Sequence, residues 1–275
     1  MTSGARVPPR SFGHPAFSVI EPRLRERLLA LDHFPAPHEL RHLSQGLSAA
    51  IPYWFDFGLQ DQAQLLAAGG FDRSLSRTSL VPTRLGSFHD LLGALIWLHF
   101  PALKTSIHRL QLAAGSHARG PSENAATHLD ESGVLVLSTE PTIFEALSAL
   151  KWAEVFWERR VELRQTTRFL VFGHGLLDAL RDPHPRLMGK ALFARISAEQ
   201  LELADCELRV FLDRTLAALL PGFLSEPARL EPLPVLGVPD WSPQQSRAYY
   251  EDERYFRRAR LRPRASRAPS WLVLG

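Results

Sequence analysis

The chain has 275 residues, 45% of them hydrophobic, and a formal net charge of +3. Its single cysteine, Cys206, excludes an internal disulfide and a multi-cysteine metal cluster, and is typical of a reducing compartment. The longest apolar stretch, residues 91–98, is far short of the ~20 residues that cross a bilayer, and residues 1–20 lack the apolar core of a secretory signal. We therefore expect a soluble, cytoplasmic protein.

The N-terminal third is predicted to combine helices with loops. Residues 1–20 resemble a flexible arm with an apolar tip at residues 17–20. Residues 22–32 and 39–50 favour two helices, with Pro35 and Pro37 between them. The aromatic stretch over residues 51–57 indicates a strand or a plug against the core. Residues 69–87 are predicted to be a loop, with a short extended piece near residues 83–85.

The rest of the chain is dominated by helical spacing. Ser87 is a good N-cap for a helix over residues 88–99, and Pro101 suits the first position of the next helix, over residues 102–114. Further helices are predicted over residues 122–130, 141–150, 152–163, 174–180 and 198–220. Strands are predicted over residues 133–139 and 168–172, whereas the apolar residues 187–196 are left unassigned.

These elements predict a helix-dominated α+β fold with a few short strands. The strands do not alternate with helices regularly enough for a doubly wound sheet. We expect one globular domain over residues 21–258, between the arm and an Arg-rich tail at residues 259–275, which is mobile or docked in an extended form. Its residues 271–274 are apolar enough to dock as a terminal strand.

The C-terminal segment concentrates positive charge. It contains six arginines without an acid among them, at positions 257, 258, 260, 262, 264 and 267. Such a segment could bind nucleic acid or another polyanion through phosphate contacts. Arginine also replaces lysine almost everywhere else in the chain, and a GC-rich genome that favours arginine codons is the preferred explanation of this bias.

Several short motifs together resemble a bacterial family, domain-of-unknown-function family 3025. They include Phe88-His89-Asp90, Asp130-Glu131 before Gly133, Phe156 to Arg160, and Phe172-Gly173-His174. The other residues that carry the resemblance are Trp97, Lys104, Arg119, Thr127, the stretch 232–239, Trp241 and Tyr250 to Asp252. The resemblance covers roughly residues 50–258 and implies a shared fold without supplying an activity.

Ionisable residues beside apolar runs are the candidates for chemistry, because burying them is costly unless they are paired, metal-bound or useful. The candidate catalytic residues are His174, Glu158, Asp130, Glu131 and His89, and the candidate binding residues are Arg119, Arg159 and Trp157. A divalent metal would suit such a set. No phosphate-binding loop, Gly-x-Ser-x-Gly elbow or His-Glu-x-x-His motif occurs.

Three functional hypotheses remain open. The first is an enzyme with a polar His/Asp/Glu/Arg pocket, in the form of a metal-assisted hydrolase. The second is a binding or scaffold protein whose motif residues form a structural hydrogen-bond network. The third is polyanion binding through the tail. The enzyme hypothesis requires His89, Asp130 and His174 to line one open cavity, whereas the scaffold hypothesis requires them to be sealed and mutually bonded.

Overall fold

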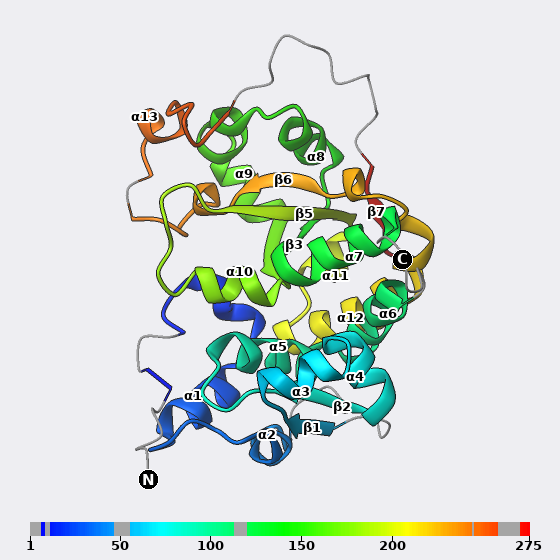
Figure 1. Cartoon of the computed structure of the whole chain (residues 1–275). Helices are drawn as coiled ribbons and strands as arrows, with labels where there is room; N and C mark the ends of the chain where they lie inside the picture. Colours follow the sequence, from blue (N-terminus) through cyan, green and yellow to red (C-terminus); the bar gives the residue numbers. More distant parts are fainter. Residues whose placement is uncertain (1–6, 9–11, 47–55, 113–119, 244, 258–269) are drawn as a thin grey trace.

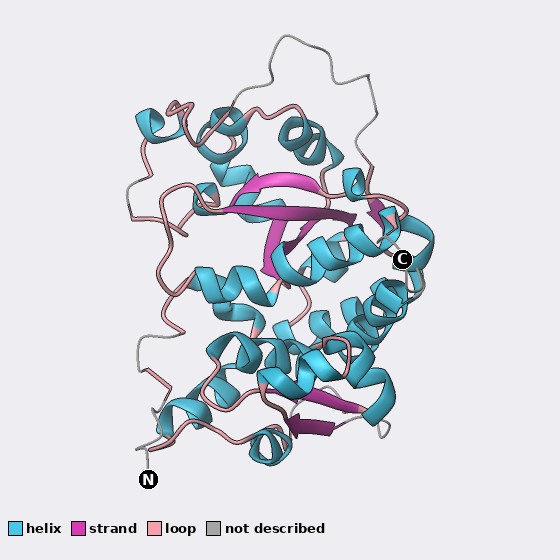
Figure 2. Ribbon diagram, viewed as in Figure 1, coloured by secondary structure: helices cyan, strands magenta, loops and turns pink. Residues whose placement is uncertain are grey.

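The computed structural model describes residues 7–8, 12–46, 56–112, 120–243, 245–257 and 270–275. Its helices are α1 (Pro22–Ala30), α2 (Pro37–Leu43), α3 (Gln62–Ala67), α4 (Phe71–Thr78), α5 (Phe88–His99), α6 (Pro101–Leu112), α7 (Pro121–Ser132), α8 (Pro141–Ser148), α9 (Arg160–Thr166), α10 (His174–Ala179), α11 (Ala198–Leu201), α12 (Asp205–Phe223) and α13 (Arg247–Tyr250). Its strands are β1 (Asp56–Leu59), β2 (Leu80–Thr83), β3 (Gly133–Ser138), β4 (Thr167–Val171), β5 (Met188–Arg195), β6 (Glu231–Pro234) and β7 (Leu272–Val273). The fold is α+β and helix-dominated (Figures 1 and 2), as the sequence predicts.

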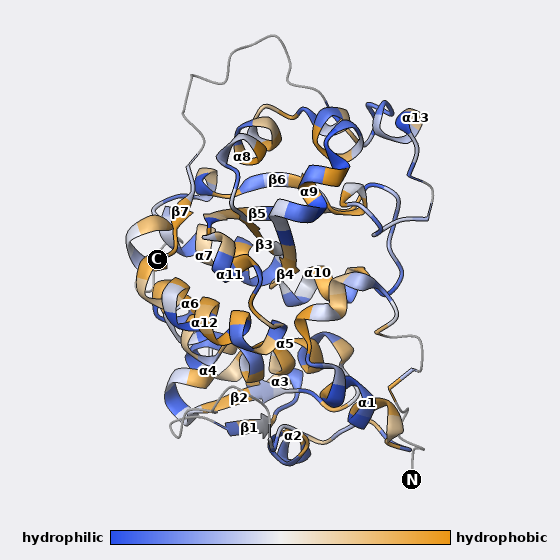
Figure 3. Ribbon diagram, turned by 180° about the vertical axis from the view of Figure 1, so that it is seen from behind, coloured by the Kyte–Doolittle hydropathy of each residue, from blue (hydrophilic) through white to orange (hydrophobic). Residues whose placement is uncertain are grey.

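A mixed sheet organises one half of the molecule. Its strands run in the order β4-β3-β5-β6, and β7 also pairs with β5. The β3–β5 pairing is parallel, whereas β4 and β6 are antiparallel to their neighbours. All six residues of β3 are buried, because helices cover both faces: α8 and α9 lie on one side, and α7 and α10 on the other (Figures 1 and 3).

A helical layer forms the other half. The helices α5, α6 and α12 pack together below the sheet, and α2, α3 and α4 surround a small parallel sheet of β1 and β2 (Figure 2). A two-stranded sheet is marginal on its own, so this unit depends on the packing of its helices. The interior is continuous between the layers, since Phe100 of the helical layer contacts Phe172 beside the main sheet at a ring-centroid distance of 5.6 Å.

Helix α5 has one side that is not buried in the core. The Ser87 hydroxyl caps it by accepting a hydrogen bond from the Asp90 backbone N–H at 3.2 Å. Nine of its twelve residues are buried. The three that are not are His89, Asp90 and Gly93, which lie on one side of the helix. This side faces a cavity rather than the core.

Three segments differ from the sequence-based predictions. The predicted loop over residues 69–87 contains α4 and β2, because Gly70 serves as the N-cap of α4 at φ 102° and Ser79 ends it in a left-handed conformation. The predicted helix over residues 152–163 is divided into a π-helical turn, η2 (Glu154–Glu158), and α9. The predicted helix over residues 198–220 is also two helices, α11 and α12, and α12 continues through Pro221.

Both termini are docked where they are described, which differs from the predicted flexible N-terminal arm and agrees with the docked alternative for the C-terminal tail. Phe12, Phe17 and Ile20 are buried, and residues Pro15–Val19 form a 3-10 helix, η1, that contacts β4. At the other end, β7 pairs in parallel with β5, and Leu272 and Leu274 are buried. Apolar side chains at both ends explain the docking. Most of the arginine-rich segment lies outside the described residues.

Candidate functional site

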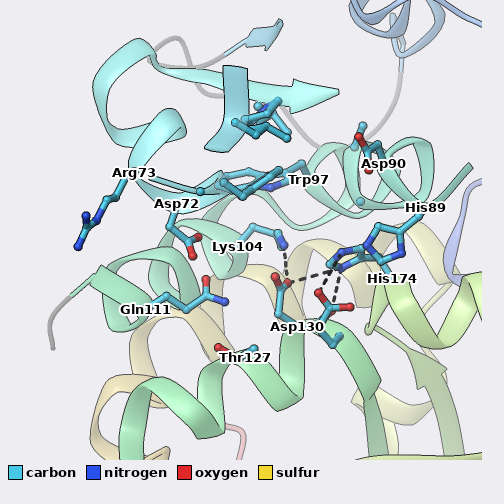
Figure 4. A pocket seen from close by; sticks show the side chains of 18 of the residues that line it. Asp72, Arg73, His89, Asp90, Trp97, Lys104, Gln111, Thr127, Asp130 and His174 are labelled. Atoms are coloured by element: carbon cyan, nitrogen blue, oxygen red, sulfur yellow. Dashed lines mark hydrogen bonds and ion pairs between the residues drawn. The ribbon is translucent and has the colours of Figure 1, made fainter. Parts of the chain in front are cut away.

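A cavity of about 790 Å³ lies between α3 and α4 on one side and α5, α6, α7 and α10 on the other (Figure 4). We call it the pocket. Of the predicted site residues, it brings together His89, Asp130, Glu131 and His174. Its other polar lining residues include Asp72, Arg73, Arg84, Asp90, Lys104, Gln111, Glu123 and Thr127.

The sheet explains why residues 130–131 and residue 174 meet. Strands β3 and β4 are antiparallel, with Val134 opposite Val171, so the start of β3 lies beside the end of β4. The backbone N–H of Gly173 donates to the Gly133 carbonyl at 2.9 Å. A Cβ on Gly173 would overlap this backbone, so the approach requires glycine. The last turn of α7 and the first turn of α10 are thereby held side by side.

His174 is oriented by its backbone contact. Its Nδ1 donates to the main-chain carbonyl of Asp130 at 2.9 Å, which leaves the Nε2 lone pair directed elsewhere. Nε2 lies 3.7 Å from Oε1 of Glu131, and the His89 ring centroid lies 4.6 Å from that of His174. Burial lowers the pKa of His174, against the opposing pull of the Asp130 carboxylate. The imidazole is therefore neutral near pH 7 and able to act as an electron-pair donor.

His89, Glu131 and His174 have the composition of a metal site. One ligand atom from each lies within 4.8 Å of those of the other two. Ligands at about 2.1 Å from a tetrahedral ion are about 3.4 Å apart, so small side-chain rotations would close the set around zinc. Histidine ligands of metal sites also usually donate their other ring N–H to a carbonyl or a carboxylate, as Nδ1 of His174 does. The half-exposed side chains of His89 and Glu131 leave the set open to the pocket.

Lys104 and Asp130 form a buried ion pair in the pocket wall. Desolvation opposes ionisation of Asp130, but the positive charge of Lys104 prevails and holds the pKa of the Asp130 carboxyl below its ordinary value. Lys104 also lies over the Trp97 ring, 5.4 Å from its centroid. The site hypotheses drawn from the sequence omitted Lys104. The available signal was a lysine beside Leu103 and Ile107 on the buried face of α6.

Asp90 has a structural role in the same wall. Its carboxylate accepts from the guanidinium of Arg84 through both oxygens, at 2.7 and 2.8 Å, and from the Arg84 backbone N–H. Its side chain is 8% exposed. The clamp ties β2 to the start of α5, so it fixes the position of the neighbouring His89.

The other predicted residues are not in this pocket. Glu158 is exposed, and Arg159 pairs with Glu162 at 2.7 Å on the far side of the sheet. Trp157 lies under the guanidinium of Arg160, 4.2 Å from the ring centroid. The expectation that these residues share a site with His174 is therefore not met, because η2 and α9 cover the opposite sheet face. Arg119 lies outside the described residues.

The chain belongs to the family described as protein of unknown function (DUF3025), whose model matches residues 56–260. The predicted family resemblance is confirmed. No curated protein and no solved structure matches the chain. Among the described helices, none has the length and apolar character needed to cross a membrane. The pocket lies entirely within elements that the family match covers.

Proposed function

We propose that the pocket is the active site of a metal-assisted hydrolase, in which His89, Glu131 and His174 hold a divalent ion such as Zn²⁺. The observation that carries the proposal is the convergence of three ligand atoms, from three separate segments, within 4.8 Å at an open cavity. Three protein ligands with an open fourth position are typical of catalytic rather than structural zinc sites. Such an ion lowers the pKa of a bound water to about 7, which supplies a nucleophile for hydrolysis.

Metal binding by the full chain is the first test. After removal of metal with a chelator, we expect one Zn²⁺ or Co²⁺ per chain in a calorimetric titration. His89→Ala, Glu131→Gln and His174→Ala should each weaken binding at least tenfold, because each removes one ligand. His128→Ala is the matched control, since His128 lies on the exposed side of α7 and does not line the pocket. Unchanged affinity in all three ligand variants would reject the metal site.

Hydrolysis is the second test. The metal-loaded protein is assayed with p-nitrophenyl acetate, p-nitrophenyl phosphate and bis(p-nitrophenyl) phosphate. We expect turnover of at least one substrate, its loss on chelation, and its recovery on return of the metal. His174→Ala should be inactive, and His128→Ala active. Turnover that persists at full rate without metal contradicts the proposed mechanism.

The scaffold hypothesis accounts for part of the network. Lys104, Asp130 and His174 are each at most 12% exposed in their side chains, as a structural network requires. The side chains of His89 and Glu131 are 38% and 46% exposed, which favours a site over a sealed network. We further propose a cytoplasmic location, supported by the single free cysteine. Cell fractionation that recovers the protein elsewhere would contradict it.

A further inference from the structure

Lys104 is a buried cation in the pocket wall with hydrogen-bonding capacity to spare. Its side chain is 4% exposed, and its ammonium group carries three N–H donors. Within the described part of the chain, the Asp130 carboxylate is the one hydrogen-bond acceptor for that ammonium, and the Trp97 ring face lies beside it. A buried ammonium with unmet donors is unfavourable. An acceptor supplied by a ligand in the pocket would meet them.

The charge around Lys104 favours an anionic acceptor. A divalent ion held by two neutral imidazoles and one carboxylate keeps one net positive charge, and the Lys104–Asp130 pair adds none. Among the other charged residues of the lining, Asp90 pairs with Arg84, and Asp72 and Glu123 are acids set against the cation of Arg73. The positive charge is therefore local: the metal ion and the Lys104 ammonium in the same lining would attract and orient an anion that reaches both.

Lys104 also lies near His174, one of the proposed ligands, and its charge contributes to lowering the pKa of that histidine. The Asp130 carboxylate oxygen that accepts from Lys104 lies 4.0 Å from Nδ1 of His174. In Figure 4 the Lys104 ammonium and the two histidine rings point toward the same part of the cavity. One small group in the cavity could contact both the ammonium and the ion.

We propose that Lys104 and the metal ion bind one oxyanion of the substrate between them, and that the substrate class is therefore phosphate esters or carboxylate-bearing molecules. This inference rests on the proposed function, because the second contact of the oxyanion is the metal. Lys104 contributes a charge-assisted hydrogen bond, which is stronger than a bond between neutral partners. In hydrolysis of a phosphate ester, Lys104 offsets the negative charge on the bound phosphate oxygen as the bond to the leaving group breaks.

The test uses the zinc-loaded full chain and two probes, inorganic phosphate and acetate, in calorimetric titrations. Lys104→Met alone would leave Asp130 buried and unpaired, which endangers folding. The informative variant is Lys104→Met with Asp130→Asn, which removes both charges together. Asp130→Asn alone keeps the cation and an amide oxygen that can accept from it, but leaves the buried charge unpaired, so its melting temperature is measured before it is titrated. Lys151→Met removes an exposed lysine that pairs with Glu154 outside the pocket.

We expect wild type, Asp130→Asn and Lys151→Met to bind at least one probe, most tightly in Asp130→Asn. The double variant should bind that probe at least tenfold more weakly while its zinc affinity stays within about threefold. Preference for phosphate or for acetate then identifies the substrate class. If the double variant and wild type bind the anion equally well, the proposed role of Lys104 is overturned and the metal site is unaffected. The same conclusion follows if zinc-loaded wild type binds neither probe. Failure of wild type to bind zinc overturns both.

Discussion

His99 provides a pH-dependent contribution to stability that follows from its two hydrogen bonds. It lies at the end of α5 and is 3% exposed. Its Nε2 accepts from the Glu21 backbone N–H at 2.9 Å, and its Nδ1 donates to the Leu95 carbonyl at 2.7 Å. The bond from Glu21 requires the neutral ring, because a protonated Nε2 cannot accept, whereas the bond to Leu95 is compatible with either form. The N-terminal segment is therefore attached to α5 by a histidine that must stay neutral.

The magnitude follows from the pKa. Burial is the main cause that lowers the pKa of His99 from 6.5 to about 4. A folded-state pKa below the unfolded value means that the unfolded chain binds more protons between these limits. The contribution of His99 to the free energy of unfolding is therefore fully present above about pH 6.5 and is lost as the pH falls toward 4. Each pKa unit corresponds to about 1.36 kcal/mol, so lowering the pH from 7.5 to 4.5 should remove about 2.5 kcal/mol through His99.

Urea unfolding followed by tryptophan fluorescence at these two pH values measures the effect. His99→Gln replaces the ring with a side chain that does not titrate. It should be less stable than wild type at pH 7.5 but lose about 2.5 kcal/mol less on acidification. His38→Gln, at an exposed position of α2, is the control and should follow wild type. Parallel losses in wild type and His99→Gln would refute the reasoning.

Three further predictions concern the pocket and the C-terminus. Gly175→Ala places a Cβ against the Glu131 carboxylate, so zinc affinity should fall at least tenfold in the calorimetric titration, and unchanged affinity would argue against Glu131 as a ligand. Gly93→Ala makes an ordinary contact at 3.4 Å and gains helix propensity of about 0.5–1 kcal/mol, so its melting temperature should rise; a fall would show that the pocket wall cannot accept a methyl group. Deleting residues 270–275 removes the buried Leu272 of β7 and the buried Leu274 after it, and should cost about 3 kcal/mol of unfolding free energy. If the truncated protein were as stable as wild type, residues 270–275 would be dispensable for folding.

Local patterns in the sequence predicted the elements that carry their own signals. Helix α5 matches its predicted bounds, because Ser87 caps it and its apolar residues repeat at helical spacing. Strand β3 also lies within the strand predicted over residues 133–139, and α10 begins at the first residue of the helix predicted over residues 174–180. The convergence of His89, Asp130 and His174 was a stated condition of the enzyme hypothesis, and all three line the pocket.

The features that the sequence did not indicate depend on contacts between segments that are distant along the chain. The charged face of η2 and α9 has the same composition as a site, but its arginine and glutamate pair with each other on the far side of the sheet. Only the strand order shows which face each helix covers. Lys104 was not recognised as a site residue, because a lysine in a helical pattern is ordinarily solvent-exposed, and its partner Asp130 is 26 residues away.

The motifs His89-Asp90, Asp130-Glu131 and Gly173-His174 each consist of two neighbouring residues with different roles. In each motif one residue fixes the backbone and its neighbour presents a side chain to the pocket. Asp90 is held by Arg84 beside His89, Asp130 by Lys104 beside Glu131, and Gly173 by the backbone of Gly133 beside His174. The neighbours of these fixed residues are the three whose ligand atoms converge. A polar network built only to specify a fold has no need to leave one residue of every pair facing a cavity, so this division of roles favours a binding site over a scaffold.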